Sequence, residues 1–472
     1  MIEKLRPVWI ITRREVRDQF RDWRIIFPIA GLTLFFPFLM NFTAQQLLNF
    51  VEEYGANIIG ERLIPFLLMI VGFFPISISL VIALESFVGE KERNSIEPLL
   101  NTPLEDWQLY LGKLLSSTVP PLLGSYLGMI VYTAGLVIKG IPIPEFGMMV
   151  LIITLTTVQA LVMGSGAVVV STQATSVRAA NLLASFIIIP AALLIQGEAI
   201  VMFWGHTDRM LWWAVFGLSV LGVLLVRVGL AHFQREELLG REIDVLNLRW
   251  MWKQFSKNFT SNTANPWHWY RQSVLPTLQR MRVSIAITTV LAAAAIAIGL
   301  TQVQRFNFPL PIENLDQIDE NLQFLINSWT AFNFQPVLYI FWNNLRVMVI
   351  AMILGYLSLG ILGVLPLIAS LGVVGYLLGL LASNGFPAMD FIWLLIPHGI
   401  FEIPAAVLAT AALLHAGALL ATPQPDQPVS VVLLSSLADW AKIMVGVVIP
   451  LLLVAAMVEA WFTPRLVLWL LQ

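Results

Sequence analysis

The chain reads ESFVGEKERNSIEPLLNTPLEDWQLYLGK from Glu85 to Lys113, a charged stretch between two long apolar runs. Charged residues avoid the hydrocarbon of a membrane, so the stretch predicts a loop at a membrane face. Thr102 and Glu105 have the spacing of a capping box, and Pro103 suits the first position of a helix. We therefore predict a short docking helix that begins at Pro103.

The apolar residues of this predicted helix fall on one face, because they recur at helical spacing. They are Leu104, Trp107, Leu111 and Leu114. Such a face predicts contact with a partner protein or with the membrane surface. The plainer interpretation is a solvated loop whose charges only keep it out of lipid. The combination of a capping box with two flanking prolines favours the docking helix.

The same stretch contains a longer pattern, E-x(4)-EKE-x(3)-IE-x-LL-x-TP followed by LxxGK. This pattern resembles the permease subunits of type-2 ABC transporters, in particular their sodium-exporter-like branch. In that family, the loop after the second membrane helix forms a coupling helix that sits in a groove of a separate ATPase subunit. The resemblance implies that the following residues couple this chain to an ATPase: Glu85, Glu90, Glu92, Glu97, Thr102, Leu104, Trp107 and Lys113.

The composition indicates a membrane protein. Hydrophobic residues make up 58% of the 472 residues and charged residues only 12%, and the mean hydropathy is +0.80. A soluble globular protein with so much apolar surface would aggregate. The net charge of −2 gives no basic character that would indicate nucleic acid. The sequence has no cysteine, which excludes disulfides, thiolate metal sites and cysteine nucleophiles.

Residues 1–24, at the N-terminus, predict an amphipathic helix that lies in the membrane interface. Its apolar stripe consists of Trp9, Val16, Phe20 and Trp23, and its arginines lie mostly off that stripe. A plain basic flank that sets the topology is the alternative. The ABC resemblance favours a helix on the cytoplasmic surface beside the ATPase. The segment lacks the short apolar core and cleavage site of a signal peptide, so we expect the first span to act as the anchor.

Six apolar runs follow that are long enough to cross about 30 Å of hydrocarbon at about 1.5 Å per residue. They lie near residues 25–48, 63–87, 114–138, 147–171, 180–197 and 210–232. Lysine and arginine cluster at both ends of this half and in the 85–113 loop, which predicts that these segments are cytoplasmic. Six spans agree with the ABC resemblance, and we assign residues 1–232 to a permease domain.

Residues 233–282 are polar and basic, with tryptophans between the charges. We expect a cytoplasmic linker that lies along anionic lipid headgroups. A surface that stacks nucleic-acid bases would use the same residue types, but the position beside a membrane argues against it. The expected partners therefore include membrane lipids and exclude nucleic acid.

Residues 283–472 predict a second helical membrane domain with five spans. The spans lie near 283–302, 338–362, 366–383, 390–421 and 440–462, and the acidic loop 303–336 is placed outside. Two polar motifs interrupt the apolar sequence, Asn343-Asn344-x-Arg346 and Pro397-His398-Gly399-x-x-Glu402. With the glycine-rich run between them, they resemble the stage II sporulation protein M family, whose members are associated with envelope remodelling.

His398 and Glu402 are four residues apart and would share one face of a helix. Arg346 could neutralise Glu402 from a neighbouring span, while Pro397 and Pro404 would break the helix. We expect one buried polar network made of Asn343, Asn344, Arg346, His398 and Glu402. A proton relay, a pair of metal ligands and a hydrolytic base remain alternatives. Two ligands do not make a zinc site, so we expect no metal.

The sequence contains no GxxxxGK[ST] phosphate loop, so we expect no enzyme activity and no cofactor in this chain. The predicted fold is an all-α polytopic protein of a prokaryotic cytoplasmic (inner) membrane. We interpret the chain as the permease subunit of an ATP-driven ABC export system. Its expected partners are two copies of an ATPase, which bind ATP-Mg, and a second permease half in a homodimer or pseudo-dimer. The alternative is a non-transporting envelope-remodelling scaffold driven by an associated ATPase, and an intramembrane hydrolase that uses His398 and Glu402 comes third.

Overall fold

The structure, a computed structural model, is built from helices throughout the residues that it describes and contains no strand there. The described residues are 2–54, 57–92, 101–174, 177–204, 207–231, 233, 248–263, 265–304, 334–385, 388–422, 427 and 429–470. The chain divides into two compact units, one of residues 1–246 with 421–425 and one of residues 247–420 with 426–472. The predicted all-α fold is therefore confirmed.

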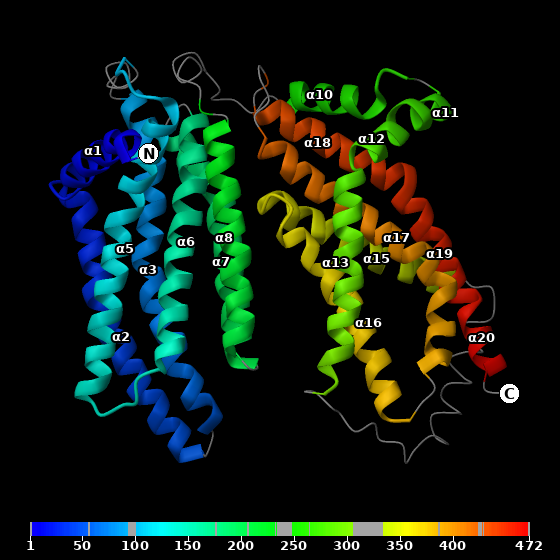
Figure 1. The fold of residues 1–472 in the computed structure, drawn as a ribbon, viewed down its shortest axis with the longest axis horizontal. Coiled ribbons are helices and arrows are strands. Elements are labelled where there is room, and N and C mark those ends of the chain that lie inside the picture. The colour runs from blue at the N-terminus through cyan, green and yellow to red at the C-terminus, as the bar shows by residue number, and fades with distance from the viewer. Residues whose placement is uncertain are drawn as a thin grey trace. The chain divides into compact units, whose positions relative to one another are not determined.

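The first unit is a bundle of long helices with a shorter helix, α1 (Ile2–Gln19), lying across one end (Figure 1). The long helices are α2 (Trp23–Tyr54), α3 (Asn57–Glu92), α5 (Asp106–Ile138), α6 (Phe146–Gln173), α7 (Val177–Trp204) and α8 (Thr207–Ala231). α3 lies at the centre and packs against α2, α5, α6 and α7. Its apolar residues are spread around the whole helix, and such a helix is stable only when neighbours surround it.

The second unit is a separate helical bundle, also with short helices across one end (Figure 1). Its long helices are α13 (Arg282–Gln302), α15 (Phe334–Leu357), α16 (Leu365–Ser383) and α17 (Ala388–Leu420). A last long segment runs through α18 (Val429–Ile443), the π-turn η4 (Met444–Val448), α19 (Ile449–Trp461) and α20 (Thr463–Leu470). The end helices are α10 (Leu248–Thr260), α11 (Pro266–Trp269), η1 (Tyr270–Val274) and α12 (Leu275–Arg280), and a 3₁₀ turn, η3 (Leu362–Val364), precedes α16.

Glycines allow α13 and α16 to approach each other at backbone distance. A Cβ at Gly299 would overlap the carbonyl oxygen of Gly372, and a Cβ at Gly375 would overlap that of Ile296. In membranes the hydrophobic effect between helices is weak, so close packing through small residues supplies much of the attraction. Gly372 and Gly375 of the glycine-rich run therefore have a packing role: they allow α16 to lie close to α13.

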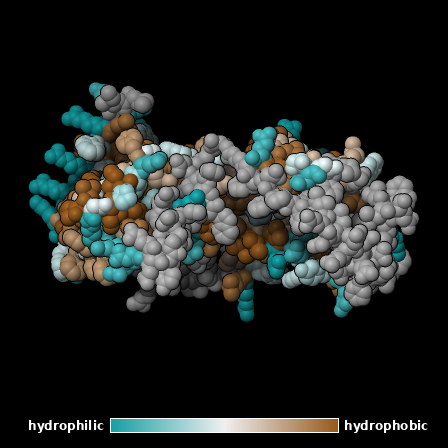
Figure 2. All heavy atoms as spheres, turned by 90° about the horizontal axis from the view of Figure 1, so that it is seen from below, coloured by the Kyte–Doolittle hydropathy of each residue, from teal (hydrophilic) through white to brown (hydrophobic). Residues whose placement is uncertain are grey.

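Within the described residues, ten helical segments are long and apolar enough to cross a membrane, five in each unit. The described part of α7 adds only the shorter apolar helix Ala191–Met202, so the sixth span of the first unit stays a prediction. Many large apolar side chains are exposed on both units, and Figure 2 shows hydrophobic side chains at the surface seen from below. Exposed apolar area on this scale is expected where lipid is the solvent.

Two predicted features of the second unit differ in the structure. Pro397 and Pro404 lie inside α17, which continues as one helix, so the predicted break is wrong. Packing of α17 against α13, α15, α18 and α19 holds the helix together although each proline removes one backbone hydrogen bond.

The predicted linker 233–282 is shorter than expected, because its second half folds onto the second unit. Val274 and Met281 are buried in a core with Met444 and Leu452. Trp269 donates from Nε1 to the carbonyl of Phe259 at 2.6 Å, which ties α11 to α10. The polar and tryptophan-rich composition therefore marks amphipathic helices at one end of the bundle rather than an extended connection.

Candidate functional site

The predicted docking segment leads directly into α5. The helix begins at Asp106 with Glu105 as its N-cap, so the prediction of a start at Pro103 is wrong. Gln108 explains the shift: its Oε1 accepts from the Glu105 backbone N–H at 3.0 Å, while its Nε2 donates to the Lys4 carbonyl at 2.9 Å. This second bond is a tertiary contact with α1. Residues 101–105 precede α5 without regular helix.

α1 packs along the first turns of α5. Thr12 Oγ1 donates to the Gly112 carbonyl at 3.3 Å, and a Cβ at Gly112 would overlap the side chain of Ile11. Val8 and Thr12 face α5 and are buried, whereas Trp9 is 65% exposed. One face of α1 therefore packs on α5, while Trp9 is turned outward. The helix ends at Gln19 and Trp23 begins α2, so the predicted helix over residues 1–24 is too long and its apolar stripe does not continue through Phe20 and Trp23.

Lys113 joins three helices through a buried ion-pair cluster. Its Nζ lies 2.6 Å from Glu90 Oε1 of α3 and 3.2 Å from Glu15 Oε1 of α1, and its side chain is 1% exposed. The Nζ also lies 5.8 Å from the ring centroid of Phe87. Breaking a pair around a fully buried charge is costly, since the charge is left without compensation. Lys113 therefore fixes the start of α5 relative to α1 and α3.

The other predicted coupling residues differ in exposure. Glu85 and Glu92 are exposed, while Thr102, Leu104 and Trp107 are half-buried. Trp107 donates from Nε1 to the Glu105 carboxylate. Glu97 lies outside the described residues, as does the rest of 93–100. The predicted set thus splits into surface residues, which can touch a partner, and the pair of Lys113 with Glu90, which is internal.

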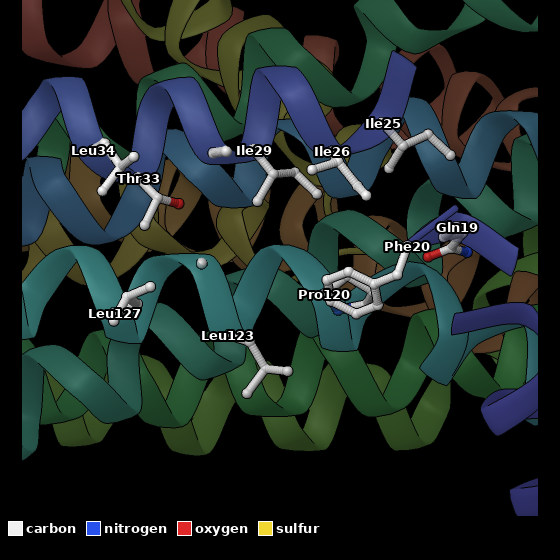
Figure 3. A pocket seen from close by; sticks show the side chains of 12 residues that line it. Gln19, Phe20, Ile25, Ile26, Ile29, Thr33, Leu34, Pro120, Leu123 and Leu127 are labelled. Atoms are coloured by element: carbon white, nitrogen blue, oxygen red, sulfur yellow. The ribbon is translucent and has the colours of Figure 1, made fainter. Parts of the chain in front are cut away.

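An apolar groove of about 270 Å³ lies between α2 and α5, near the corner where α1 ends. Gln19 and Phe20 close one end of the groove, and Ile29 and Leu127 lie along its sides (Figure 3). A Cβ at Gly124 would overlap Ile29, so the glycine keeps this part of the groove open. The groove places apolar surface beside the exposed arginines of α1.

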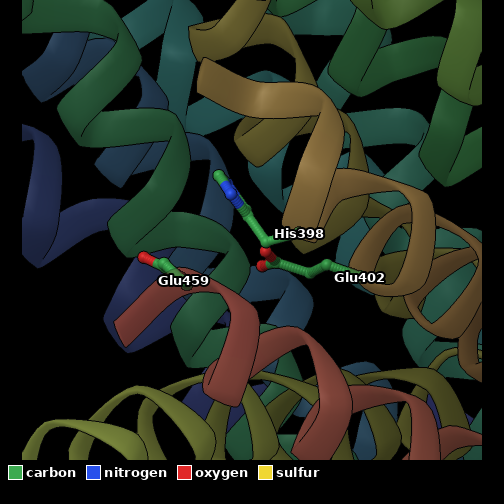
Figure 4. Close-up of side chains that lie close together, drawn as sticks. All are labelled: His398, Glu402 and Glu459. Carbon is green, nitrogen blue, oxygen red and sulfur yellow. The ribbon is translucent and has the colours of Figure 1, made fainter. Parts of the chain in front are cut away.

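A polar cluster in the second unit is built around the Pro397-His398-Gly399-x-x-Glu402 motif. His398 and Glu402 lie on α17, and Glu459 of α19 joins them (Figure 4). One ligand-type atom from each of these side chains lies within 4.8 Å of the others. The hydroxyl of Thr463 lies 3.4 Å from His398 Nδ1. All of these side chains are partly buried, and the first three lie within segments long enough to span a membrane.

Arg346 does not take part in this cluster, contrary to the prediction. It is exposed on α15 and donates from Nη2 to Asn343 Oδ1 of its own helix at 3.0 Å. Asn343, Asn344, His398 and Glu402 do line a common cavity of about 250 Å³ between α15, α16 and α17. The predicted network is therefore split into an arginine–asparagine pair at the surface and a histidine–carboxylate cluster inside.

The sequence did not predict a functional role for three further residues. Glu15 pairs with Lys113, Glu459 joins His398, and Glu198 of α7, which is buried, accepts from Gln159 Nε2 at 2.7 Å. An acidic residue within an apolar run is the signal that could have identified Glu198 and Glu459, because such residues are rare in membrane spans. No local signal identifies Glu15, which is one of several charges on α1.

Comparison with known families assigns the two halves. Residues 6–195 match the ABC-2 type transporter family, and residues 284–464 match the stage II sporulation protein M family. The first part of the chain is thus similar to ABC-2 type transporters and the second part to stage II sporulation protein M. The ABC-2 match includes most of α1, the ion-paired Lys113 and most of α7, and the sporulation protein M match includes the His398 cluster.

Two archaeal relatives are similar to parts of the chain. The uncharacterized protein MJ0793 of Methanocaldococcus jannaschii is 27% identical over 195 residues, which are 40% of this chain and 99% of the relative. The uncharacterized protein MJ0706 of the same organism is 30% identical over 129 residues, which are 27% of this chain and 54% of the relative. No solved structure matches the chain. The ABC-2 region and the apolar helices together identify a multi-pass membrane protein with a transporter permease domain.

Proposed function

We propose that this chain is the permease subunit of an ATP-driven export system and that a separate ATPase docks on the segment before α5. The ATPase would supply the phosphate loop that the chain lacks and would bind ATP-Mg. Two ATPase copies and a second permease half, identical or related, would complete the complex in a prokaryotic cytoplasmic membrane. The match of residues 6–195 to the ABC-2 family supports this proposal.

The cluster around Lys113 is the observation that carries the proposal. Residues 101–107 present surface, and within two turns α5 is fixed to α1 and α3 by Lys113, Glu15 and Glu90. A displacement of residues 101–107 would therefore move three helices together. An interface that only anchors a partner needs no such internal link, whereas an interface that transmits force does.

Mutation of the apolar anchors tests the docking site. The double change Leu104→Ala and Trp107→Ala is expected to weaken co-purification with the ATPase, because a few buried apolar residues carry most of the energy of an interface. Ile138→Ala with Phe146→Ala is the control, since both apolar residues are exposed and they lie at the end of α5 and the start of α6, away from residues 101–107. Unchanged co-purification and ATPase stimulation in the first variant would overturn the proposal.

A non-transporting envelope-remodelling scaffold is the second candidate. The observation that favours it is the second unit, which has its own core and matches the stage II sporulation protein M family. Vesicles that contain only this chain and its ATPase separate the two candidates. ATP-dependent movement of lipids or solutes across the vesicle membrane supports export, whereas ATP turnover without such movement supports the scaffold.

A further inference from the structure

The His398 cluster contains one more potential metal ligand than the sequence motif alone provides. His398 and Glu402 are one turn apart on α17, and Glu459 comes from α19 (Figure 4). We propose that His398, Glu402 and Glu459 bind a divalent transition-metal ion, with zinc as the representative ion. The site lies in the sporulation protein M region, and it does not depend on the proposed coupling to an ATPase.

The distances between the three ligand atoms are close to those found around a bound metal ion. Ligands of a tetrahedral zinc ion, each about 2.1 Å from the metal, lie about 3.4 Å from one another. The three ligand atoms already lie within 4.8 Å of one another. The remaining distance is of the size that rotation of the long glutamate side chains can cover. The helix spacing of His398 and Glu402 is the spacing by which paired ligands commonly meet one metal ion.

The two carboxylates of the cluster need compensation by a metal ion or by a proton. Glu402 and Glu459 lie within 4.8 Å of each other in apolar helices. Among the described residues neither carboxylate forms an ion pair or a hydrogen bond. Two cations of the membrane-spanning helices in this unit bond to other residues: Arg346 bonds to Asn343, and Lys442 bonds to Asp439. Two adjacent carboxylates in a medium of low dielectric constant repel each other unless a metal ion or a proton compensates them.

Thr463 and the neighbouring cavity supply two further features of a metal site. The Thr463 hydroxyl lies 3.4 Å from His398 Nδ1, where it can accept a hydrogen bond from Nδ1–H. In that tautomer Nε2 would be the nitrogen that binds the metal. His398 and Glu402 also line the cavity of about 250 Å³ between α15, α16 and α17. A fourth coordination position could therefore be reached by water or by a small ligand from this cavity.

The donor set favours a transition metal over magnesium or calcium. One imidazole nitrogen with two carboxylate oxygens suits zinc, manganese or iron, whereas calcium takes six to eight oxygen ligands. Mg²⁺ keeps most of its water shell and rarely selects a histidine. We therefore choose Zn²⁺ as the probe and use Mg²⁺ as the comparison ion.

Titration of the full-length chain with zinc chloride tests the site. The chain is purified in detergent, stripped with a chelator and titrated against a competing chromophoric chelator. We expect about one zinc ion per chain at this site and a higher Tm with Zn²⁺ than with Mg²⁺. Glu459→Gln and Glu402→Gln are each expected to weaken zinc binding by about tenfold or more. His415→Asn, on α17 but outside the cluster, is the control for His398→Asn and is expected to bind zinc as the unaltered chain does.

The thermal unfolding of each metal-free variant shows whether it is folded. If Glu459→Gln does not fold, Glu459→Asp keeps the charge but shortens the side chain, and it is expected to bind zinc more weakly. Absence of zinc binding by the unaltered chain at micromolar concentrations would overturn the proposal and would indicate that the two carboxylates share a proton. Equal zinc affinity of a folded Glu459 variant and the unaltered chain would also overturn it, because the ion would then lie elsewhere.

Discussion

Lys113 Nζ lies 2.6 Å from Glu90 Oε1 although the Lys113 side chain is almost completely buried. The two residues come from α5 and α3, the helices on either side of the charged stretch that begins at Glu85. Their contact brings the two ends of that stretch together. It also changes the interpretation of both residues, because a buried lysine that is already paired acts within the unit and does not touch a partner.

Removal of the buried charge is expected to destabilise the first unit. Lys113→Met leaves Glu90 and Glu15 without their cation, and breaking a buried pair costs about 3 kcal/mol or more. Thermal unfolding in detergent measures the loss as a lower Tm. Lys253→Met, at an exposed position of α10, should leave Tm nearly unchanged. Equal Tm values for the two variants would show that the cluster contributes nothing to stability.

Arg346 is expected to contribute little to stability, in contrast to what the sequence suggests. Because its side chain is exposed and, among the described residues, bonds to Asn343 of the same helix, Arg346→Gln should change the free energy of unfolding by no more than about 0.5 kcal/mol. Denaturation of this variant beside the unaltered chain is the measurement. A loss of several kcal/mol would contradict this expectation and would show that Arg346 belongs to a buried network with His398 and Glu402.

Glycine substitutions are expected to have opposite effects at two positions. At Gly375, Ala would place a methyl group on the carbonyl of Ile296, so the variant should lose about 1–3 kcal/mol. At Gly217 of α8 a Cβ meets nothing within 4 Å. There Ala should stabilise the helix by up to about 1 kcal/mol, because alanine is the better helix former. Thermal unfolding of both variants checks the sign, and a neutral Gly375→Ala would contradict the close contact of α13 and α16.

Thr463→Val tests the hydrogen bond behind the proposed metal ligand. If the hydroxyl orients His398, its removal should lower zinc affinity by about tenfold without changing the number of ions bound. Thr301→Val, at an exposed position of α13, is the control. Identical zinc affinity in both variants would show that Thr463 does not position the imidazole.

Cysteine labelling tests the topology, since the sequence contains no cysteine that would compete. Asn258→Cys lies on α10 and is expected to be cytoplasmic, whereas Gln317→Cys lies in the acidic loop 303–336 and is expected to be external. In intact cells a membrane-impermeant maleimide should therefore label only position 317. Labelling of position 258 alone would reverse the orientation.

The sequence by itself determined the features that depend on neighbouring residues. Apolar runs of about 20 residues predict spans whatever surrounds them, and the spacing of His398 and Glu402 places both on one helical face in any fold. The motifs from Glu85 to Lys113 and around His398 likewise indicated the two families, because each motif lies in one continuous stretch.

Only the tertiary structure decided which polar groups meet. Gln108 at the start of α5 bonds to Lys4 of α1, Lys113 pairs with a residue 98 positions earlier, and Glu459 reaches His398 from another helix. Arg346 turns outward for the same reason. In spans that are apolar around most of their circumference, hydrophobic periodicity does not fix the rotation of each helix. The rotation is set by the packing of whole helices, and it places each polar group beside its partner.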